Sequence, residues 1–247
     1  MPSDLRWIVE GPADGPCNMA RDEAILLAVS AANAPATLRF YRWSPPTISL
    51  GYFQSYADYA ALPPPAGALP VVRRLTGGGA ILHDIELTYS LTLPLGHPLL
   101  PACGPSGLYD VVHQAFARLL GRWGVPITSA THEARTSSHR GPFFCFERHS
   151  RYDLLADGRK IMGSAQRRAR TAVLQHGSLI LERRFDQQQC SPVADYVKPN
   201  LEQWLPLLAA EIADGLPGEP GSLSVRELQC ADQLYAKYAD PAWTRRR

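Results

Sequence analysis

Three consecutive glycines at positions 77–79 follow a pair of arginines at 73–74. An apolar segment before them and an alternating segment after them predict strands at 69–72 and 86–93. Glycine has no Cβ, so this run lets the backbone approach a ligand closely and adopt positive φ. Its bared N–H groups and the two guanidinium groups suit a carboxylate or a phosphate. A flexible hairpin with solvated arginines fits the same residues, because glycine-rich patterns alone are weakly specific.

A second stretch, GRKIMGSAQRRARTAVLQHGSLIL at 158–181, narrows the interpretation. Together with RRLTGGGAILHDIELTYSL at 73–91, it resembles the family of lipoate–protein ligases, octanoyltransferases and biotin ligases. Residues 7–9 and 18–23 resemble the first strand and first helix of that family. The order and separation of these motifs, across roughly residues 5–200, make the resemblance specific.

Composition is ordinary for a globular protein, with 45% hydrophobic residues and a formal net charge of +2 among 247 residues. It implies no strong general attraction to nucleic acid or to a membrane surface. No apolar run approaches the ~20 residues that span a bilayer, and the N-terminal residues do not resemble a secretory signal. Five cysteines without a CxxC pair predict a reducing, cytoplasmic environment with no disulfide framework and no metal site.

Periodicity predicts an α+β fold with a mostly antiparallel, mixed sheet flanked by helices. Further strands are expected at 5–9, 37–43, 47–51, 152–155, 160–166 and 172–181. Helices are expected after a cap at Asn18 and at 55–62, 107–123, 201–212 and 224–238, with a linker at 215–221. The resemblance implies the fold of biotin and lipoate ligases, which is related to class II aminoacyl-tRNA synthetase cores. We expect a single catalytic domain over 1–247, including C-terminal helices at about 201–240.

Cys145 lies among phenylalanines in a segment at 129–150 that has no clear period. A cysteine in such surroundings is commonly a buried, inert thiol. Long ordered loops are often functional, however, and Cys145 precedes Lys160 by fifteen residues. The cysteine-dependent octanoyltransferases of the family have a similar Cys-Phe in this loop, so the resemblance implies that Cys145 is the nucleophile. The ligase branch needs no cysteine.

Lys160 is the candidate partner of the thiol. A free cysteine has a pKa of about 8.5, and a nearby ammonium group favours its reactive thiolate form. The lysine fits two other roles equally well. It would donate to the oxyanion of a tetrahedral intermediate, or in a ligase it would hold the acyl carbonyl and the phosphate of an acyl-adenylate. A solvated lysine on a strand is the plain alternative.

The resemblance also implies an acyl or lipoyl pocket built from both motifs. The residues expected to shape it are Arg73, Arg74, Gly77, Gly78, Gly79, His83, Gly163, Ser164, Ala165 and His176. Small residues in the second motif fit close strand packing or the floor of an acyl site, where each buried CH₂ contributes about 0.8 kcal/mol. Each histidine on its own fits a hydrogen-bonded structural role better than that of a base.

Three arginines follow the small residues of the second motif, at positions 167, 168 and 170. Charged residues at the end of a strand are most simply explained as a solvated face. The same charges would suit an acidic protein partner.

Three functions remain open from the residues. The first is transfer of an octanoyl or lipoyl group from acyl carrier protein, through an acyl-Cys145 thioester and without a cofactor. Its acceptors would be lipoyl domains of 2-oxoacid dehydrogenases or the glycine cleavage H protein. The second is an ATP- and magnesium-dependent lipoate–protein ligase. The third is a non-catalytic protein that binds lipoyl domains.

Overall fold

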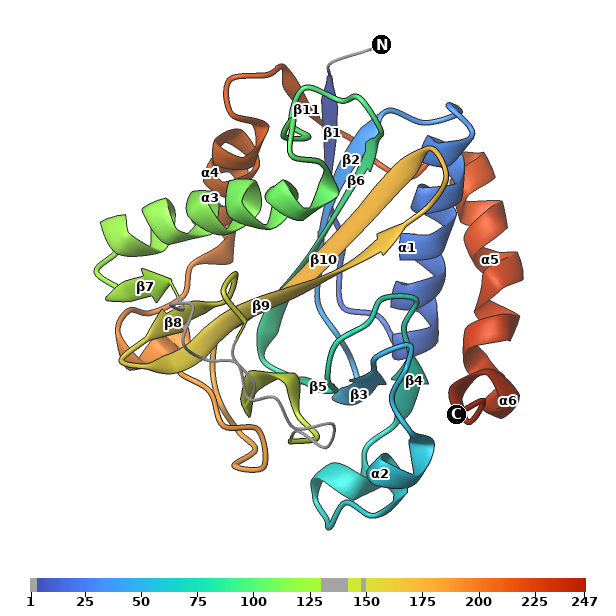
Figure 1. Ribbon diagram of the computed structural model, residues 1–247, viewed down its shortest axis with the longest axis vertical. Helices are drawn as coiled ribbons and strands as arrows, with labels where there is room; N and C mark the ends of the chain where they lie inside the picture. Colours follow the sequence, from blue (N-terminus) through green and yellow to red (C-terminus); the bar gives the residue numbers. More distant parts are fainter. Residues whose placement is uncertain (1–3, 130–141, 148–149) are drawn as a thin grey trace.

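The computed structural model describes residues 4–129, 142–147 and 150–247. Its main sheet contains β1 (Leu5–Val9), β2 (Ala36–Tyr41), β6 (Glu86–Pro94), β7 (Ile127–Ser129), β8 (Leu154–Ala156), β9 (Arg159–Arg168), β10 (Ala172–Ile180) and β11 (Gly218–Pro220). The strand order is β11-β1-β2-β6-β10-β9-β8-β7 (Figure 1). The β11–β1 and β1–β2 pairs are parallel and the remaining pairs are antiparallel. The prediction of a mostly antiparallel, mixed sheet is therefore confirmed.

Helices cover both faces of this sheet. The helices of the described residues are α1 (Gly15–Ser30), α2 (Tyr56–Ala60), α3 (Leu108–Arg122), α4 (Leu201–Ala213), α5 (Val225–Ala239) and α6 (Pro241–Thr244). Helices α3 and α4 lie on one face, and α1 lies on the other with α5 packed against its outer side (Figure 1). The described residues also contain single-turn 3₁₀ helices, at Ala66–Ala68, Pro105–Gly107, Cys145–Glu147 and Val193–Asp195.

The first helix starts four residues earlier than the sequence suggested. Its cap is Asp14, whose carboxylate accepts a hydrogen bond from the backbone N–H of Cys17 at 2.8 Å. The prediction of a cap at Asn18 is therefore wrong. Asn18 is buried inside α1, and its side-chain amide donates to the backbone carbonyls of Ala13 and Arg42. It thus ties the helix to the chain that follows β2.

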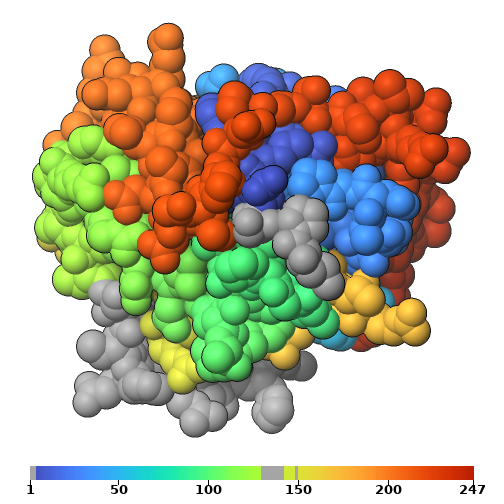
Figure 2. Space-filling view, turned by 90° about the horizontal axis from the view of Figure 1, so that it is seen from above, coloured from blue at the N-terminus to red at the C-terminus, as the bar shows by residue number. Residues whose placement is uncertain are grey.

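The last long helix begins as expected. Ser224 and Glu227 form a capping box, in which each side chain accepts a hydrogen bond from the backbone N–H of the other. The segment expected as a linker at 215–221 contains the short strand β11, which pairs with β1 in parallel. Seen from above in Figure 2, the chain between α4 and α5 runs beside the N-terminal strand. Strand β11 therefore forms the edge of the sheet at that end.

The alternating residues of β6 give the two sheet faces different characters. Leu87, Tyr89 and Leu91 are buried in the apolar core formed with α3 and α4. Full burial of such side chains stabilises the fold by roughly 1.5–3 kcal/mol each. The residues between them, Thr88 and Ser90, are buried on the opposite face beneath α1. That face therefore collects polar side chains inside the protein.

A second, three-stranded sheet holds the glycine run. Its strands are β3 (Thr47–Leu50), β4 (Val71–Arg73) and β5 (Ile81–His83), in the order β4-β3-β5. The glycines connect β4 to β5, and both of these strands pair with β3 rather than with each other. The interpretation as a hairpin is therefore wrong, and β5 is a strand that periodicity did not predict.

Candidate active site

The backbone of Cys145 forms a hydrogen bond with Ala80, the residue that follows the glycine run. Its backbone N–H donates to the carbonyl of Ala80 at 2.7 Å, and the Ala80 N–H donates to the carbonyl of Phe143 at 3.0 Å. A Cβ at Gly79 would lie 3.0 Å from both the N and the Cα of Cys145. Only a glycine allows this approach without a shift of the backbone. The glycine run of the first motif is therefore in contact with the candidate nucleophile.

Lys160 extends from β9 to the same point. Its Nζ lies 3.4 Å from the Sγ and 3.3 Å from the backbone oxygen of Cys145. It also forms an ion pair of 2.9 Å with Asp153, and only 2% of its side chain is exposed. Burial lowers the pKa of Lys160, but the negative charges of Cys145 and Asp153 outweigh it, so the pKa lies above its usual value. The side chain is thus an ammonium at neutral pH.

Asp153 is a site residue that sequence reasoning missed. It lies just before β8, and its Oδ2 accepts both the Lys160 ion pair and the backbone N–H of Ser150, at 2.7 Å. Its side chain is 4% exposed, so a carboxylate is held next to the ammonium away from water. The one signal in the sequence was an acidic residue ahead of the lysine motif, which did not distinguish it from other surface acids.

Arg74 is buried and forms hydrogen bonds with the backbone of the glycine run. Its Nη2 donates to the carbonyls of Gly77 and Gly79 at 2.8 and 2.7 Å, and its Nη1 donates to the carbonyl of Ser49. Burial lowers the pKa of Arg74 to about 10, which still leaves it charged at neutral pH. Gly78 adopts a positive φ of 90°, which a residue with a side chain rarely tolerates. These bonds fix the shape of the run.

Arg73 has a different position from the one expected. Its guanidinium donates to the backbone carbonyls of Gly51 and Gln54, at 2.9 and 2.7 Å, and to that of Thr244 in α6. These backbone carbonyls accept the hydrogen bonds of the Arg73 guanidinium, which was expected to bind a carboxylate or a phosphate. The physical reason is that β4 points this side chain away from the pocket and towards the C-terminal segment.

A narrow pocket lies between the small sheet and the polar face of the main sheet. Its walls are mostly apolar or aromatic, with polar groups at a few points. The lining residues are Met19, Tyr41, Trp43, Ser49, Arg74, Ile81, His83, Thr88, Ala165, His176, Gly177 and Ser178.

Both predicted histidines line this pocket as hydrogen-bonded residues. His83 stacks on Trp43 with ring centroids 3.8 Å apart, and its nitrogens meet Ser49 Oγ at 2.8 Å and Glu86 Oε1 at 3.1 Å. Burial lowers the pKa of His83, which favours the neutral ring. His176 bridges the buried Asp22, at 3.1 Å, and the hydroxyl of Thr76, at 2.6 Å. Among the described residues, the ring nitrogens of both histidines thus bind groups other than Cys145.

The three small residues of β9 have three different positions. Ala165 lines the pocket. Gly163 makes room for the lysine, since a Cβ there would lie 2.3 Å from Lys160 Cε and 2.6 Å from its Nζ. Ser164 points to the other face, where its hydroxyl lies 2.7 Å from Tyr89 OH and 2.6 Å from His113 Nε2. Alternation along the strand therefore separates Ser164 from the pocket.

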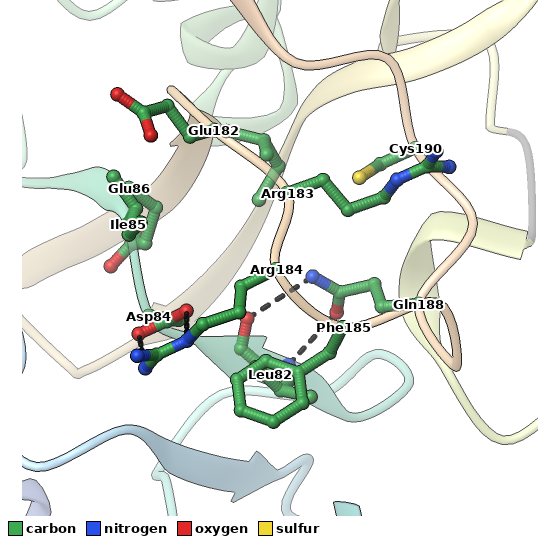
Figure 3. A pocket seen from close by; sticks show the side chains of 11 residues that line it. Leu82, Asp84, Ile85, Glu86, Glu182, Arg183, Arg184, Phe185, Gln188 and Cys190 are labelled. Atoms are coloured by element: carbon green, nitrogen blue, oxygen red, sulfur yellow. Dashed lines mark hydrogen bonds and ion pairs between the residues drawn. The ribbon is translucent and has the colours of Figure 1, made fainter.

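A second pocket lies on the other side of β5 (Figure 3). Gln188 binds both the N–H and the carbonyl of Leu82 there, at 2.8 and 3.1 Å, and so covers the free edge of the strand. Cys190 also lines this pocket, and burial raises its pKa to about 11. Its thiol is therefore protonated at neutral pH, unlike a cysteine prepared for attack.

Over 4–129, 142–147 and 150–247, no group of three or more His, Cys, Asp or Glu side chains is arranged to hold a metal ion. Over the same ranges, no helix combines the length and apolar character required to cross a bilayer.

Comparisons with known proteins agree with the geometry. The family described as Lipoyl protein ligase A/B catalytic domain matches residues 14–203. Octanoyltransferase LipM from Moorella thermoacetica is 36% identical over 100% of both chains, and that from Kyrpidia tusciae is 33% identical over 98% of each. The structure of lipoate-protein ligase A bound with ATP superposes with a TM-score of 0.76 at 20% identity, over 99% of each chain. A bi-partite lipoate protein ligase from Thermoplasma acidophilum gives 0.74 at 19% identity, over 98% of this chain and 96% of that one. These solved structures share the fold.

Proposed function

Because the chain belongs to the family of lipoyl protein ligase A/B catalytic domains, we propose that it transfers an octanoyl or lipoyl group through a thioester on Cys145. The donor is acyl carrier protein. The acceptor is a specific lysine on lipoyl domains of 2-oxoacid dehydrogenases or on the glycine cleavage H protein, in the cytoplasm. The observation that carries the proposal is the contact of 3.4 Å between Lys160 Nζ and Cys145 Sγ, beside a mostly apolar pocket.

The first half of the reaction forms the acyl-enzyme. The Lys160 ammonium stabilises the Cys145 thiolate, which attacks the carbonyl carbon of the donor thioester. A tetrahedral intermediate forms and then collapses. The carbon–sulfur bond to the carrier breaks, and the carrier thiolate leaves and takes up a proton. The pocket lined by Ile81 and Ala165 receives the acyl chain, which gains from leaving water.

The second half transfers the acyl group to nitrogen. The neutral amine of the target lysine attacks the acyl-Cys145 carbonyl. The carbon–sulfur bond then breaks, and the nitrogen gives up one proton to the leaving Cys145 thiolate as the amide forms. A lysine with a pKa near 10.4 is neutral in roughly one molecule in 2,500 at pH 7. The acceptor lysine must therefore lose its proton in the site. Unless the site supplies a base, this requirement makes the transfer to nitrogen slower than the formation of the acyl-enzyme.

The arrangement supports the transferase over the ATP-dependent ligase. In the ligase interpretation, Arg73, Arg74 and the glycines hold the nucleotide phosphate. Here Arg73 and Arg74 donate to backbone carbonyls, and the chain itself occupies these donors. A thiol next to a buried ammonium serves no step of an acyl-adenylate mechanism, and it has no function in a non-catalytic binding protein.

Intact mass measurement of the acyl-enzyme tests the proposal. Incubation with octanoyl-carrier protein, without an acceptor, should add one octanoyl group that hydroxylamine removes and that maps to Cys145. Cys145→Ala should lose both the adduct and the transfer to a lipoyl domain while keeping the far-ultraviolet circular dichroism of the wild type. Cys103→Ala is a matched control, since this thiol is exposed and is remote from Lys160 in the sequence. Full transfer by Cys145→Ala would overturn the proposal.

A further inference from the structure

An arginine-rich surface, formed by Arg167, Arg246, Arg247, Tyr52 and Phe53, adjoins the glycine run. Arg246 lies 4.3 Å from the centre of the Tyr52 ring, and its Nη2 donates to the Tyr52 hydroxyl at 2.6 Å. Arg247 lies 5.2 Å from the Phe53 ring, and Arg167 lies 5.6 Å from the Tyr52 ring. Residues from three distant parts of the sequence thus gather their charges around two aromatic rings.

This surface lies at the edge of the candidate active site. The N–H of Tyr52 donates to the carbonyl of Thr76 at 2.8 Å, and a Cβ at Gly77 would lie 3.9 Å from the Phe53 ring. Arg167 follows Ala165 by two positions in β9, so both lie on the sheet face that forms the pocket. A molecule bound here is close to the glycine run and to the pocket.

Arg73 fixes the C-terminal part of this surface. Its guanidinium donates twice to the carbonyl of Thr244, and its own carbonyl accepts from the Trp243 indole N–H at 2.9 Å. Helix α6 is thereby held against β4, as Figure 1 shows. The predicted site residue Arg73 therefore positions Arg246 and Arg247 over Tyr52.

The positive charge of the surface is not neutralised by neighbouring carboxylates. In the part of the chain that the structure describes, Arg167, Arg246 and Arg247 are exposed and none forms an ion pair with an acidic side chain. The hydrogen bond from Arg246 and the charges of all three arginines lower the pKa of Tyr52. Phe53 is 68% exposed, which is unusual for a phenylalanine. The surface thus offers both charge and an aromatic face to a partner.

We propose that the arginine-rich surface docks the acyl donor, an acidic carrier protein whose thioester arm is attached through a phosphodiester; the inference rests on the proposed octanoyl transfer. Guanidinium groups bind phosphate oxygens in a bidentate manner. The two rings pack against the uncharged part of the arm, which leads towards Cys145 past the glycine run. An acceptor lysine is attached through no phosphate, so the donor is the partner that this chemistry fits.

Single-turnover acylation of Cys145 with two donors tests this docking. One donor is octanoyl-carrier protein, and the other is octanoyl-pantetheine, which lacks both the phosphate and the acidic protein. The variant is Arg246→Glu with Arg247→Glu. The control is Arg226→Glu, which reverses an exposed charge at the beginning of α5, the end opposite to α6. Rate constants are measured at low and at high salt.

We expect the double variant to react about tenfold or more slowly with octanoyl-carrier protein, since steering by charge supplies that factor. Its rate should depend less on salt, and its reaction with octanoyl-pantetheine should match the wild type. Equal slowing with both donors, or no slowing with either, would overturn the docking. Slowing confined to the transfer from acyl-Cys145 to the lipoyl domain would assign the surface to the acceptor instead. If neither donor acylates the wild type, octanoyl transfer itself fails and the docking falls with it.

Discussion

The Nζ of Lys160 lies 3.4 Å from the Sγ of Cys145, although the two residues belong to a 3₁₀ turn and to a strand of the main sheet. Asp153 holds the ammonium from its other side at 2.9 Å. The lysine is therefore fixed between two groups that carry negative charge when the thiol is ionised. Substitution of the ammonium or of the carboxylate should therefore have a distinct effect on acylation or on stability.

Lys160→Met should slow the acylation of Cys145 by roughly tenfold or more, which corresponds to about 1.4 kcal/mol of lost transition-state stabilisation. The reason is that the thiolate loses the positive charge beside it. The loss should be smaller than that of Cys145→Ala, which removes the nucleophile. Stopped-flow acylation and alkylation by iodoacetamide at neutral pH measure the effect. The control Lys198→Met removes an exposed lysine and should react at the wild-type rate.

Asp153→Asn should lower the free energy of unfolding by about 3 kcal/mol, because it removes the carboxylate that forms an ion pair with the buried ammonium of Lys160. The double variant Asp153→Asn with Lys160→Met should recover part of that loss, since neither charge then remains. Urea unfolding of the four proteins gives the coupling energy. Additive losses from the two substitutions would contradict the ion pair as a stabilising contact.

Gly163→Ala should reduce acylation while the protein stays folded. A Cβ at this position would lie 2.3 Å from Lys160 Cε, so the lysine must leave its place between Asp153 and Cys145. The same substitution at Gly11 is the control, because a Cβ there meets no heavy atom within 4 Å. Wild-type acylation by Gly163→Ala, with circular dichroism unchanged, would mean that the position of Lys160 is unimportant.

His113 should make stability fall in mild acid. Burial lowers its pKa in the folded protein, against the opposing effects of the Tyr152 carbonyl and Asp153. The unfolded chain then binds the proton more readily, so the free energy of unfolding decreases as the pH falls below about 6.5, the unfolded pKa. Thermal melts between about pH 7 and pH 5 should show a smaller decrease for His113→Gln. If the melting temperature depends equally on pH in the two proteins, the His113 ring does not contribute to the loss of stability in acid.

Transfer from octanoyl-carrier protein should need neither ATP nor magnesium. A thioester already carries an activated acyl group, so no adenylate has to form. Acylation of a lipoyl domain should continue after treatment with EDTA and apyrase, as judged by intact mass. Activity that appears only with free octanoate and ATP would support the ligase instead.

The sequence by itself determined the longer strands of the main sheet and the two motifs, but not the three-residue strands β7 and β11. Period-two alternation at 86–93 and 172–181 predicted β6 and β10, because burial of one face imposes that pattern locally. The capping box at Ser224 was predicted for the same reason, since its partners are three residues apart. The resemblance of the motifs led to Cys145 and Lys160, whose proximity the structure then supplied.

Tertiary structure alone decided how distant residues meet. Asp153 pairs with Lys160, His176 binds Asp22 and Thr76, and β9 turns Ser164 away from the pocket. Each of these relations depends on strand register or on the packing of α1, which a local pattern does not encode. The sequence suggested that Arg73 binds an anion, but in the structure Arg73 binds the C-terminal segment. Its partner Thr244 lies 171 residues away in the chain, so no local pattern could indicate this contact. A guanidinium looks the same in sequence whether a phosphate or a carbonyl meets it, and only the folded chain determines which acceptor is within reach.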